Sequence, residues 1–261
     1  MTEERETSRR RTDYVQSLER GLAVLRSFDA EHRELRLSEV AARTGLTRAA
    51  ARRFLLTLVE LGYVAVEEGR FSLRPRVLSL GYAYLSGLSF AEVARPRVAR
   101  LVAELEESSS ISVLDDTEVV YVVRMPTRRI MTITLAVGTR LPAYATSMGR
   151  VLLAALPAAE RERRLERIEL RRLTPRTVRS RAALRRELGL VAEQGYALVD
   201  QELEQGLRSV AVPLRDGEGG VAALNVSAHA SRASMEDLRE RFLPSLLASA
   251  AAIEAEAREG G

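Results

Sequence analysis

The sequence of 261 residues contains no cysteine. This absence excludes disulfide bonds, thiol catalysis and zinc or iron–sulfur centres held by cysteine, and it fits a reducing compartment such as the cytoplasm. Long apolar runs are missing too. No stretch reaches the roughly 18 apolar residues of a membrane span, and the charged start MTEERETSRRRTDY lacks the apolar core of a signal peptide. We therefore expect a cytoplasmic protein without a membrane partner.

Lysine is absent as well, so all 40 basic residues are arginine, and the net charge is only +4. Arginine stays charged and presents a planar set of donors that suits phosphate and guanine. Between residues 36 and 53 a single acid, Glu39, is outnumbered by the arginines Arg36, Arg43, Arg48, Arg52 and Arg53. A local basic cluster of this kind is typical of nucleic-acid binders, although a solvated helix face would have the same composition.

The stretch LRLSEVAARTGLTRAAARRFLLTLVELGYV has the pattern of two helices joined by a tight turn. The first helix is expected at about residues 38–44 with Ser38 as its N-cap. The second helix runs from its N-cap Thr47 to Leu61. Gly45 lies between them, where a helix end favours a residue in the left-handed conformation.

Further signals lie on either side of this helix pair. Apolar residues with helical spacing occupy residues 14–28, and two short strands flank Glu67-Glu68-Gly69-Arg70. Three helices followed by a hairpin predict a winged helix-turn-helix over residues 14–75, preceded by a disordered arm of residues 1–13. An αα-hairpin without a role in DNA binding is the alternative.

In a helix-turn-helix the second helix enters the major groove and contacts bases through its first residues. Arg48 and Arg52 are four residues apart and share one helix face, and arginine is the usual partner of guanine O6 and N7. The alanines at residues 49–51 would allow a close approach to DNA, while the core anchors would be Phe54, Leu58 and Leu61. Phosphate contacts are expected from Arg20 and Arg70. The full set expected to contact double-stranded operator DNA is Arg20, Ser38, Thr47, Arg48, Ala49, Arg52, Arg53 and Arg70.

The rest of the chain predicts a linker and a second domain. Residues 76–95 are expected to form a helical linker with a break at residues 87–89, and Pro96 predicts a kink or a break just before it. Residues 96–257 contain consecutive strands joined by tight turns, which predicts an α+β domain with an antiparallel sheet and flanking helices. The strands expected are a hairpin around Asp115-Asp116, a strand over residues 129–138, the stretch YALVDQE, and a hairpin around residues 217–220.

Small polar residues mark a candidate binding site in this second domain. Strand alternation places Asn225 and Ser227 on one face, and Ser209 occupies a similar position on the preceding strand. A helix begins at residues 146–149, and free N–H groups at a helix start bind anions. Together they could enclose a small carboxylate, with countercharge from Arg124, Arg128 and Arg129. The alternative is the solvated face of an antiparallel sheet.

Signals for an enzyme are weak. The histidines are His32 and His229, and only His229 lies near a candidate nucleophile, Ser227. The sequence has no G-x-S-x-G, no G-x-x-x-x-G-K, no G-x-G-x-x-G and no metal-ligand spacing. We expect no catalytic residues, no metal and no cofactor. Two alternatives stay open: a small-molecule enzyme with a DNA-binding-like appendage, and a DNA-binding protein without a ligand.

The motifs taken together resemble a known family. SLERGLAVLRSFDAEHRELRLSEVAARTGLTRAAARRFLLTLVELGYV is similar to the winged helix of IclR-type transcriptional regulators, and GYALVDQELEQGLRSVAVPLRDGEGGVAALNVSA resembles their pocket strands. PTRRIMTITLAVGTRLPAYATSMGRVLLA is closest to the branch of PcaR, PcaU and PobR, which controls β-ketoadipate-pathway genes for aromatic-acid breakdown. The resemblance implies a ligand-responsive regulator that is not an enzyme.

The resemblance also implies a GAF-like effector-binding and oligomerisation domain over residues 96–257, homodimers or dimers of dimers, and contact with RNA polymerase if the protein is an activator. Asp200 would repel an anionic effector unless it is protonated, binds a ligand hydroxyl or faces away. Arg150 replaces a lysine common in the wider family, a change expected to matter little. The small organic-acid effector would contact Ile130, Leu141, Ser147, Met148, Gly149, Asp200, Leu207, Ser209, Asn225 and Ser227.

Overall fold

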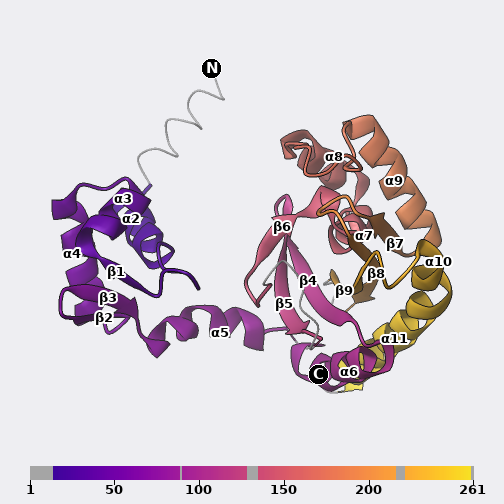
Figure 1. Ribbon diagram of the computed structural model, residues 1–261, viewed down its shortest axis with the longest axis horizontal. Helices are drawn as coiled ribbons and strands as arrows, with labels where there is room; N and C mark the ends of the chain where they lie inside the picture. Colours follow the sequence, from indigo (N-terminus) through magenta and orange to yellow (C-terminus); the bar gives the residue numbers. More distant parts are fainter. Residues whose placement is uncertain (1–13, 89, 128–134, 216–220, 260–261) are drawn as a thin grey trace. The chain divides into compact units, whose positions relative to one another are not determined.

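The computed structural model describes residues 14–88, 90–127, 135–215 and 221–259. These residues form two compact units, one ending at Tyr84 and the other beginning at Leu85 (Figure 1). The arm of residues 1–13 lies outside the described residues. Among the described segments, no helix is both long and apolar enough to cross a bilayer.

The first unit is the predicted winged helix-turn-helix. Val24, Val40, Leu55 and Phe71 are buried in its apolar core. Its short sheet has the strand order β1-β3-β2, with both pairings antiparallel. The sequence analysis missed β1, which is only three residues long. The elements are α2 (Gln16–Leu25), β1 (Glu34–Arg36), α3 (Leu37–Thr44), α4 (Arg48–Glu60), β2 (Val64–Glu67) and β3 (Arg70–Leu73).

Local capping explains where the helices of this unit begin and end. Gly45 ends α3 in the left-handed conformation, with φ 67°. Thr47 caps α4, because its hydroxyl accepts a hydrogen bond of 3.2 Å from the N–H of Ala50. The prediction that Ser38 caps α3 is wrong. Strand β1 runs directly into α3, so the capping position falls on Arg36, whose N–H donates to Glu39 Oε2 at 2.6 Å.

The segment after the hairpin is helical with one interruption. It consists of η1 (Pro75–Leu78), α5 (Ser79–Ser86) and α6 (Phe90–Leu105), and α5 ends just before Gly87. Of the two outcomes expected at Pro96, a kink or a break just before it, the break does not occur, because Pro96 lies inside α6. Ala94, Val98 and Leu101 of α6 are buried, and this packing holds the helix together despite the hydrogen bond that proline cannot donate.

The second unit contains the predicted antiparallel sheet, with strand order β6-β5-β4-β9-β8-β7. The hairpin at Asp115-Asp116 joins β4 to β5, as expected. Of the strand expected over residues 129–138, residues 128–134 lie outside the described residues, and 135–138 lead through a turn into β6. The strands are β4 (Ser108–Asp115), β5 (Glu118–Met125), β6 (Arg140–Pro142), β7 (Ala197–Asp200), β8 (Leu207–Arg215) and β9 (Val221–His229).

Helices cover both faces of this sheet (Figure 1). Alternate residues such as Val210 and Leu224 pack against α6 and α11. Ala211 and Ala223 point the other way and pack beneath α7 and α9. The predicted α+β class is therefore confirmed. The elements not yet placed are η2 (Ala143–Ala145), α7 (Ser147–Ala155), α8 (Ala158–Arg167), α9 (Arg181–Gln194), α10 (Met235–Asp237), η3 (Leu238–Phe242) and α11 (Leu243–Glu259).

Candidate DNA-binding surface and effector cavity

The outer side of α4 carries an arginine surface. Arg48, Arg52 and Arg53 are exposed, and none of their guanidinium groups has an ion-pair or hydrogen-bond partner in the part of the chain that the structure describes. Ala49 is exposed beside them, which leaves room for close contact. The helix therefore offers unpaired cations and one small residue to a ligand.

The opposite side of α4 holds the helix in the core, with two corrections to the sequence analysis. Ala51 is fully buried, so it packs inward with Leu55 and Leu58 and does not approach a ligand. Leu61 is 51% exposed, so it does not belong to the core as expected. The helical period is 3.6 residues, so Ala51, Leu55 and Leu58 share one stripe.

The other expected DNA contacts lie on neighbouring elements. Arg20 on α2, Ser38 on α3 and Arg70 at the start of β3 are exposed, whereas the hydroxyl of Thr47 is occupied as the cap of α4. Arg43 differs from the rest of the basic cluster, because its guanidinium pairs with Asp29 at 2.5 Å. Its charge is already balanced within the unit.

A small cavity of about 20 Å³ lies between the start of α7 and the sheet. That volume accommodates about one water molecule. Six of the residues expected to contact an effector line it, namely Ser147, Met148, Leu207, Ser209, Asn225 and Ser227. The remaining lining residues are Tyr121, Ala145, Thr146, Val199 and Leu203.

Gly149 and Leu141 do not line the cavity, and Ile130 lies outside the described residues. Gly149 instead lets α7 approach η2, because a Cβ there would lie 2.2 Å from the carbonyl oxygen of Ala143. Its N–H donates to Thr146 Oγ1 at 3.1 Å. This amide is therefore not free to bind an anion, contrary to the expectation. Leu141 lies on β6 and packs in the apolar cluster beneath α7.

Asp200 faces away from the cavity, which answers the question raised by its charge. Its carboxylate accepts a 2.7 Å hydrogen bond from Arg208 and forms an ion pair with Arg176. Burial acts to raise the pKa of Asp200, but hydrogen bonds from Arg208 and Gln201 outweigh it, and the pKa lies below its ordinary value. Asp200 is thus a paired carboxylate that stabilises the end of β7.

A β-bulge brings Tyr121 and Arg124 of β5 to the sheet face beneath α7. The register between β4 and β5 shifts at Ile111/Ser112, so Tyr121 lies opposite Ser112 and Arg124 lies opposite Ser110. Regular alternation would place Tyr121 and Arg124 on opposite faces, because they are three positions apart in the sequence and neighbouring residues of a strand point to opposite faces. The sequence analysis offered Arg124 only as one of three cations near the site and did not identify Tyr121.

Arg124 forms part of a polar row across three strands. Its Nη1 donates to Ser110 Oγ at 3.0 Å, and Ser110 lies opposite Asn225 on β9. The amide nitrogen of Asn225 donates to Ser227 Oγ at 2.8 Å. Among the described residues, Arg124 Nε and Asn225 Oδ1 are buried without a hydrogen-bond partner. The row therefore holds one unused donor and one unused acceptor.

Burial governs the ionisation of this row. It lowers the pKa of Arg124 and raises the pKa of Tyr121 to about 12. Tyr121 therefore stays neutral at physiological pH. A buried polar atom without a partner costs about 1–3 kcal/mol, and a ligand with a carboxylate at one end and a hydroxyl at the other would satisfy both unused atoms.

The histidine and serine considered as a catalytic pair are not hydrogen-bonded to each other. His229 Nδ1 lies 2.7 Å from the hydroxyl of Ser231 and does not pair with Ser227. Within residues 14–88, 90–127, 135–215 and 221–259, no group of three histidine, aspartate or glutamate side chains could hold a metal ion.

Family comparisons cover nearly the whole chain. Residues 17–68 match the IclR helix-turn-helix domain, and residues 82–255 match the bacterial transcriptional regulator IclR C-terminal domain. The chain belongs to the IclR family of transcriptional regulators. As an IclR-family member it is a DNA-binding regulator and not an enzyme, so the enzyme alternative is set aside.

Individual relatives place this IclR-family protein in the expected branch. It is 44% identical to the Pca regulon regulatory protein of Pseudomonas putida, over 91% of this chain and 82% of that protein. It is 38% identical to the p-hydroxybenzoate hydroxylase transcriptional activator of Acinetobacter baylyi, over 91% of this chain and 90% of that protein. An IclR homologue from Microbacterium hydrocarbonoxydans, crystallised with 4-hydroxybenzoate, superimposes with TM-score 0.82 at 28% identity, covering 93% of this chain and 99% of that one.

Proposed function

We propose that this IclR-family regulator senses a small organic acid from aromatic catabolism and transmits its binding to operator DNA. The observation that carries the proposal is the pair of buried atoms without a hydrogen-bond partner among the described residues, Arg124 Nε and Asn225 Oδ1, together with the cavity that Asn225 lines. The relatives named for Pca and p-hydroxybenzoate genes, and the homologue that holds 4-hydroxybenzoate, support the same class of ligand. The candidate effectors are 4-hydroxybenzoate, protocatechuate and β-ketoadipate.

The effector carboxylate would bind the guanidinium of Arg124 near the hydroxyl of Ser110. The start of α7, at Ser147 and Met148, would add the positive end of the helix dipole. A ligand hydroxyl would donate to Asn225 Oδ1. This arrangement moves the anion away from the amide of Gly149, which is already bonded to Thr146.

Operator DNA would contact the exposed face of α4, with Arg48 and Arg52 on bases and Arg20 and Arg70 on phosphates. We infer that residues 14–75 form the DNA-binding domain, residues 76–95 the linker, and residues 96–257 the effector-binding and oligomerisation domain. Since the ligand is genomic DNA, we place the protein in the cytoplasm. If it activates transcription, RNA polymerase is a further partner.

A homodimer is the assembly that the surface of α2 favours. Tyr14, Val15, Leu18 and Leu22 are exposed large apolar residues on or just before one short helix. Contiguous exposed apolar surface marks a protein interface more often than a free surface. A second copy would bury these side chains, and pairs of dimers could form on longer operators.

Isothermal calorimetry and gel shifts test the proposal together. The protein would be titrated with 4-hydroxybenzoate, protocatechuate and β-ketoadipate, and with the neutral isostere 4-hydroxybenzamide as a matched control. At least one acid should bind and change the affinity for upstream DNA of its own locus, typically by about 5- to 150-fold, while the amide should not bind. Equal binding of acid and amide, or no effect of any acid on DNA affinity, would contradict the proposal.

A further inference from the structure

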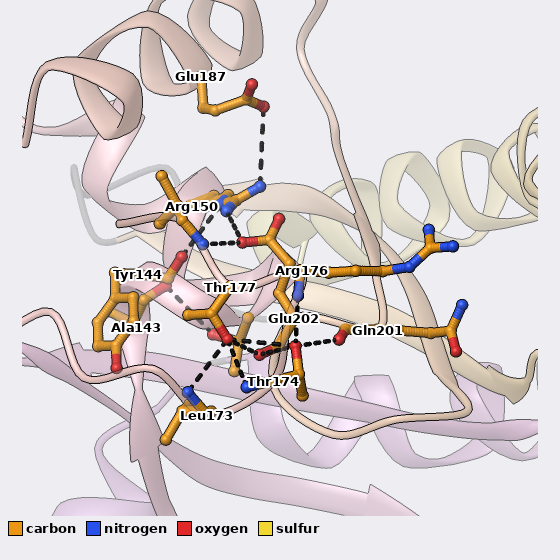
Figure 2. A network of polar contacts seen from close by, with 12 residues as sticks. Ala143, Tyr144, Arg150, Leu173, Thr174, Arg176, Thr177, Glu187, Gln201 and Glu202 are labelled. Atoms are coloured by element: carbon orange, nitrogen blue, oxygen red, sulfur yellow. Dashed lines mark hydrogen bonds and ion pairs between the residues drawn. The ribbon is translucent and has the colours of Figure 1, made fainter. Parts of the chain in front are cut away.

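Arg150 is a buried cation within the apolar helix α7. It is the largest fully buried side chain among the described residues, with 2% of its surface exposed. Its Nε donates to the carbonyl oxygen of Tyr144 at 3.1 Å, and its Nη2 donates to Glu202 Oε2 at 2.6 Å. Figure 2 shows the guanidinium pointing at Glu202, with Glu187 at 3.7 Å on its other side. The expectation that arginine in place of lysine matters little here stays a prediction, and these contacts give the arginine a defined structural position.

Glu202 belongs to the loop of residues 201–206 between β7 and β8, here called the cap loop. Its carboxylate also accepts from the N–H of Val178 at 2.9 Å, and its carbonyl oxygen accepts from Thr177 Oγ1 at 2.7 Å. The carbonyl oxygen of Gln201 accepts from Thr174 Oγ1 at 2.7 Å. The cap loop is thus fastened at its first two residues, and the Arg150–Glu202 contact is the charged part of that fastening (Figure 2).

The next residue of the cap loop, Leu203, lines the cavity. The other lining residues belong to strands or to the segment from η2 into α7. That segment is held rigidly, because Gly149 packs directly on the backbone of Ala143. Among the described lining residues, Leu203 is thus the one that lies in a loop outside these elements, although the ends of the cap loop carry backbone hydrogen bonds at Gln201 and Gly206.

The cavity is too small for an effector as it stands. Its volume is about 20 Å³, whereas a core cavity that admits benzene measures roughly 150 Å³. Entry of an aromatic acid requires the wall to open. Opening at the cap loop separates Glu202 from Arg150 and leaves this buried cation, among the described residues, with only the longer 3.7 Å ion-pair contact to Glu187, which is unfavourable.

We propose that the Arg150–Glu202 ion pair is a latch that keeps the cap loop closed and limits the rate at which the effector enters and leaves. The proposal rests on the proposed function in one respect, that the cavity receives the effector. The open form is a minor state, and binding through a minor state is slowed by its low population. If the cap loop closes again over the ligand, weakening the latch raises both rate constants and leaves the dissociation constant nearly unchanged.

Glu202→Gln tests the latch, since it keeps the size of the side chain and an acceptor oxygen while removing the charge. Glu204→Gln is the matched control in the same loop, because no side-chain partner of Glu204 occurs among the described residues. With 4-hydroxybenzoate in stopped-flow measurements, Glu202→Gln should raise the association and dissociation rate constants about tenfold, equivalent to about 1.4 kcal/mol. The dissociation constant should stay within about threefold of the parent, and Glu204→Gln should behave as the parent.

Hydrogen exchange on the unliganded protein judges the latch without any effector. Amides of residues 203–206 should exchange faster in Glu202→Gln than in the parent or Glu204→Gln, and Arg150→Lys, which keeps the charge, should fall between. Unchanged exchange and unchanged rates in Glu202→Gln would overturn the latch, as would equal acceleration in Glu204→Gln. If the parent bound no acid, the proposed function would fail, while the exchange result would still decide whether the ion pair holds the loop.

Discussion

Replacing Arg124 with methionine separates ligand recognition from folding. In the unliganded protein, the change removes the hydrogen bond from Arg124 to Ser110 and also removes the buried Nε that has no partner among the described residues. These effects oppose each other, and each amounts to about 1–3 kcal/mol. The free energy of unfolding should therefore change by no more than about 2 kcal/mol, the largest difference between those two terms.

Effector binding should respond much more strongly to Arg124→Met. A hydrogen bond to a charged group contributes about 1.5–3 kcal/mol, so the loss of the guanidinium should weaken 4-hydroxybenzoate binding roughly 10- to 150-fold. Calorimetry measures the affinity, and urea unfolding measures stability. Arg140→Met is the matched control, because Arg140 pairs with Asp115 and Glu118 at the edge strand β6 of the same sheet. Parent-like effector affinity in Arg124→Met would refute the assignment, and a loss of several kcal/mol of stability alone would make Arg124 a structural residue.

Three further predictions concern DNA contacts and pH. Arg48→Ala or Arg52→Ala should weaken the free energy of binding to the specific operator by about 1–3 kcal/mol and relax base preference. Gel shifts on operator variants measure this. Unchanged selectivity in both variants would rule out α4 as the helix that contacts bases. Arg70→Ala should weaken binding to all DNA sequences. It should also reduce by about one the slope of the logarithm of the binding constant against the logarithm of salt concentration, measured by titration at several salt concentrations. A changed base preference with an unchanged slope would count against this assignment. Burial raises the pKa of Tyr121 to about 12, above its value in the unfolded chain. The stability that the protonated Tyr121 gives the folded state is therefore fully present below about pH 10 and is lost as the pH rises towards 12. Urea unfolding at pH 9 and 11.5 should show a loss on the order of 2 kcal/mol that is absent from Tyr121→Phe; identical pH dependence in parent and variant would contradict this.

The winged helix-turn-helix could be predicted almost completely because its signals are local. Gly45 and Thr47 mark the turn and the start of α4 through their own backbone and side-chain chemistry. Strand β1 escaped prediction, because three residues carry no periodicity of their own. It is a strand only because Leu35 pairs with Phe71. The same pairing moved the start of α3 and removed Ser38 from its cap.

The candidate site could be predicted in part. Strand alternation was sufficient to group Ser209, Asn225 and Ser227, since these residues lie on regular β8 and β9. Gly149 was placed in the site by its position at a helix start. The structure instead uses it as a packing residue against Ala143, and a contact between two segments has no sequence signature.

The sequence by itself determined that Arg48 and Arg52 of α4 face outward and that Asn225 and Ser227 of β9 share a face with Ser209 of β8, because both follow from regular backbone periods. Only the tertiary structure decided that Tyr121 and Arg124 share a face, since a bulge shifts the register of β5. It alone also decided that Arg150 pairs with Glu202, 52 residues further along the chain. A buried cation must find its counter-charge wherever the fold brings one, and no local pattern records that meeting.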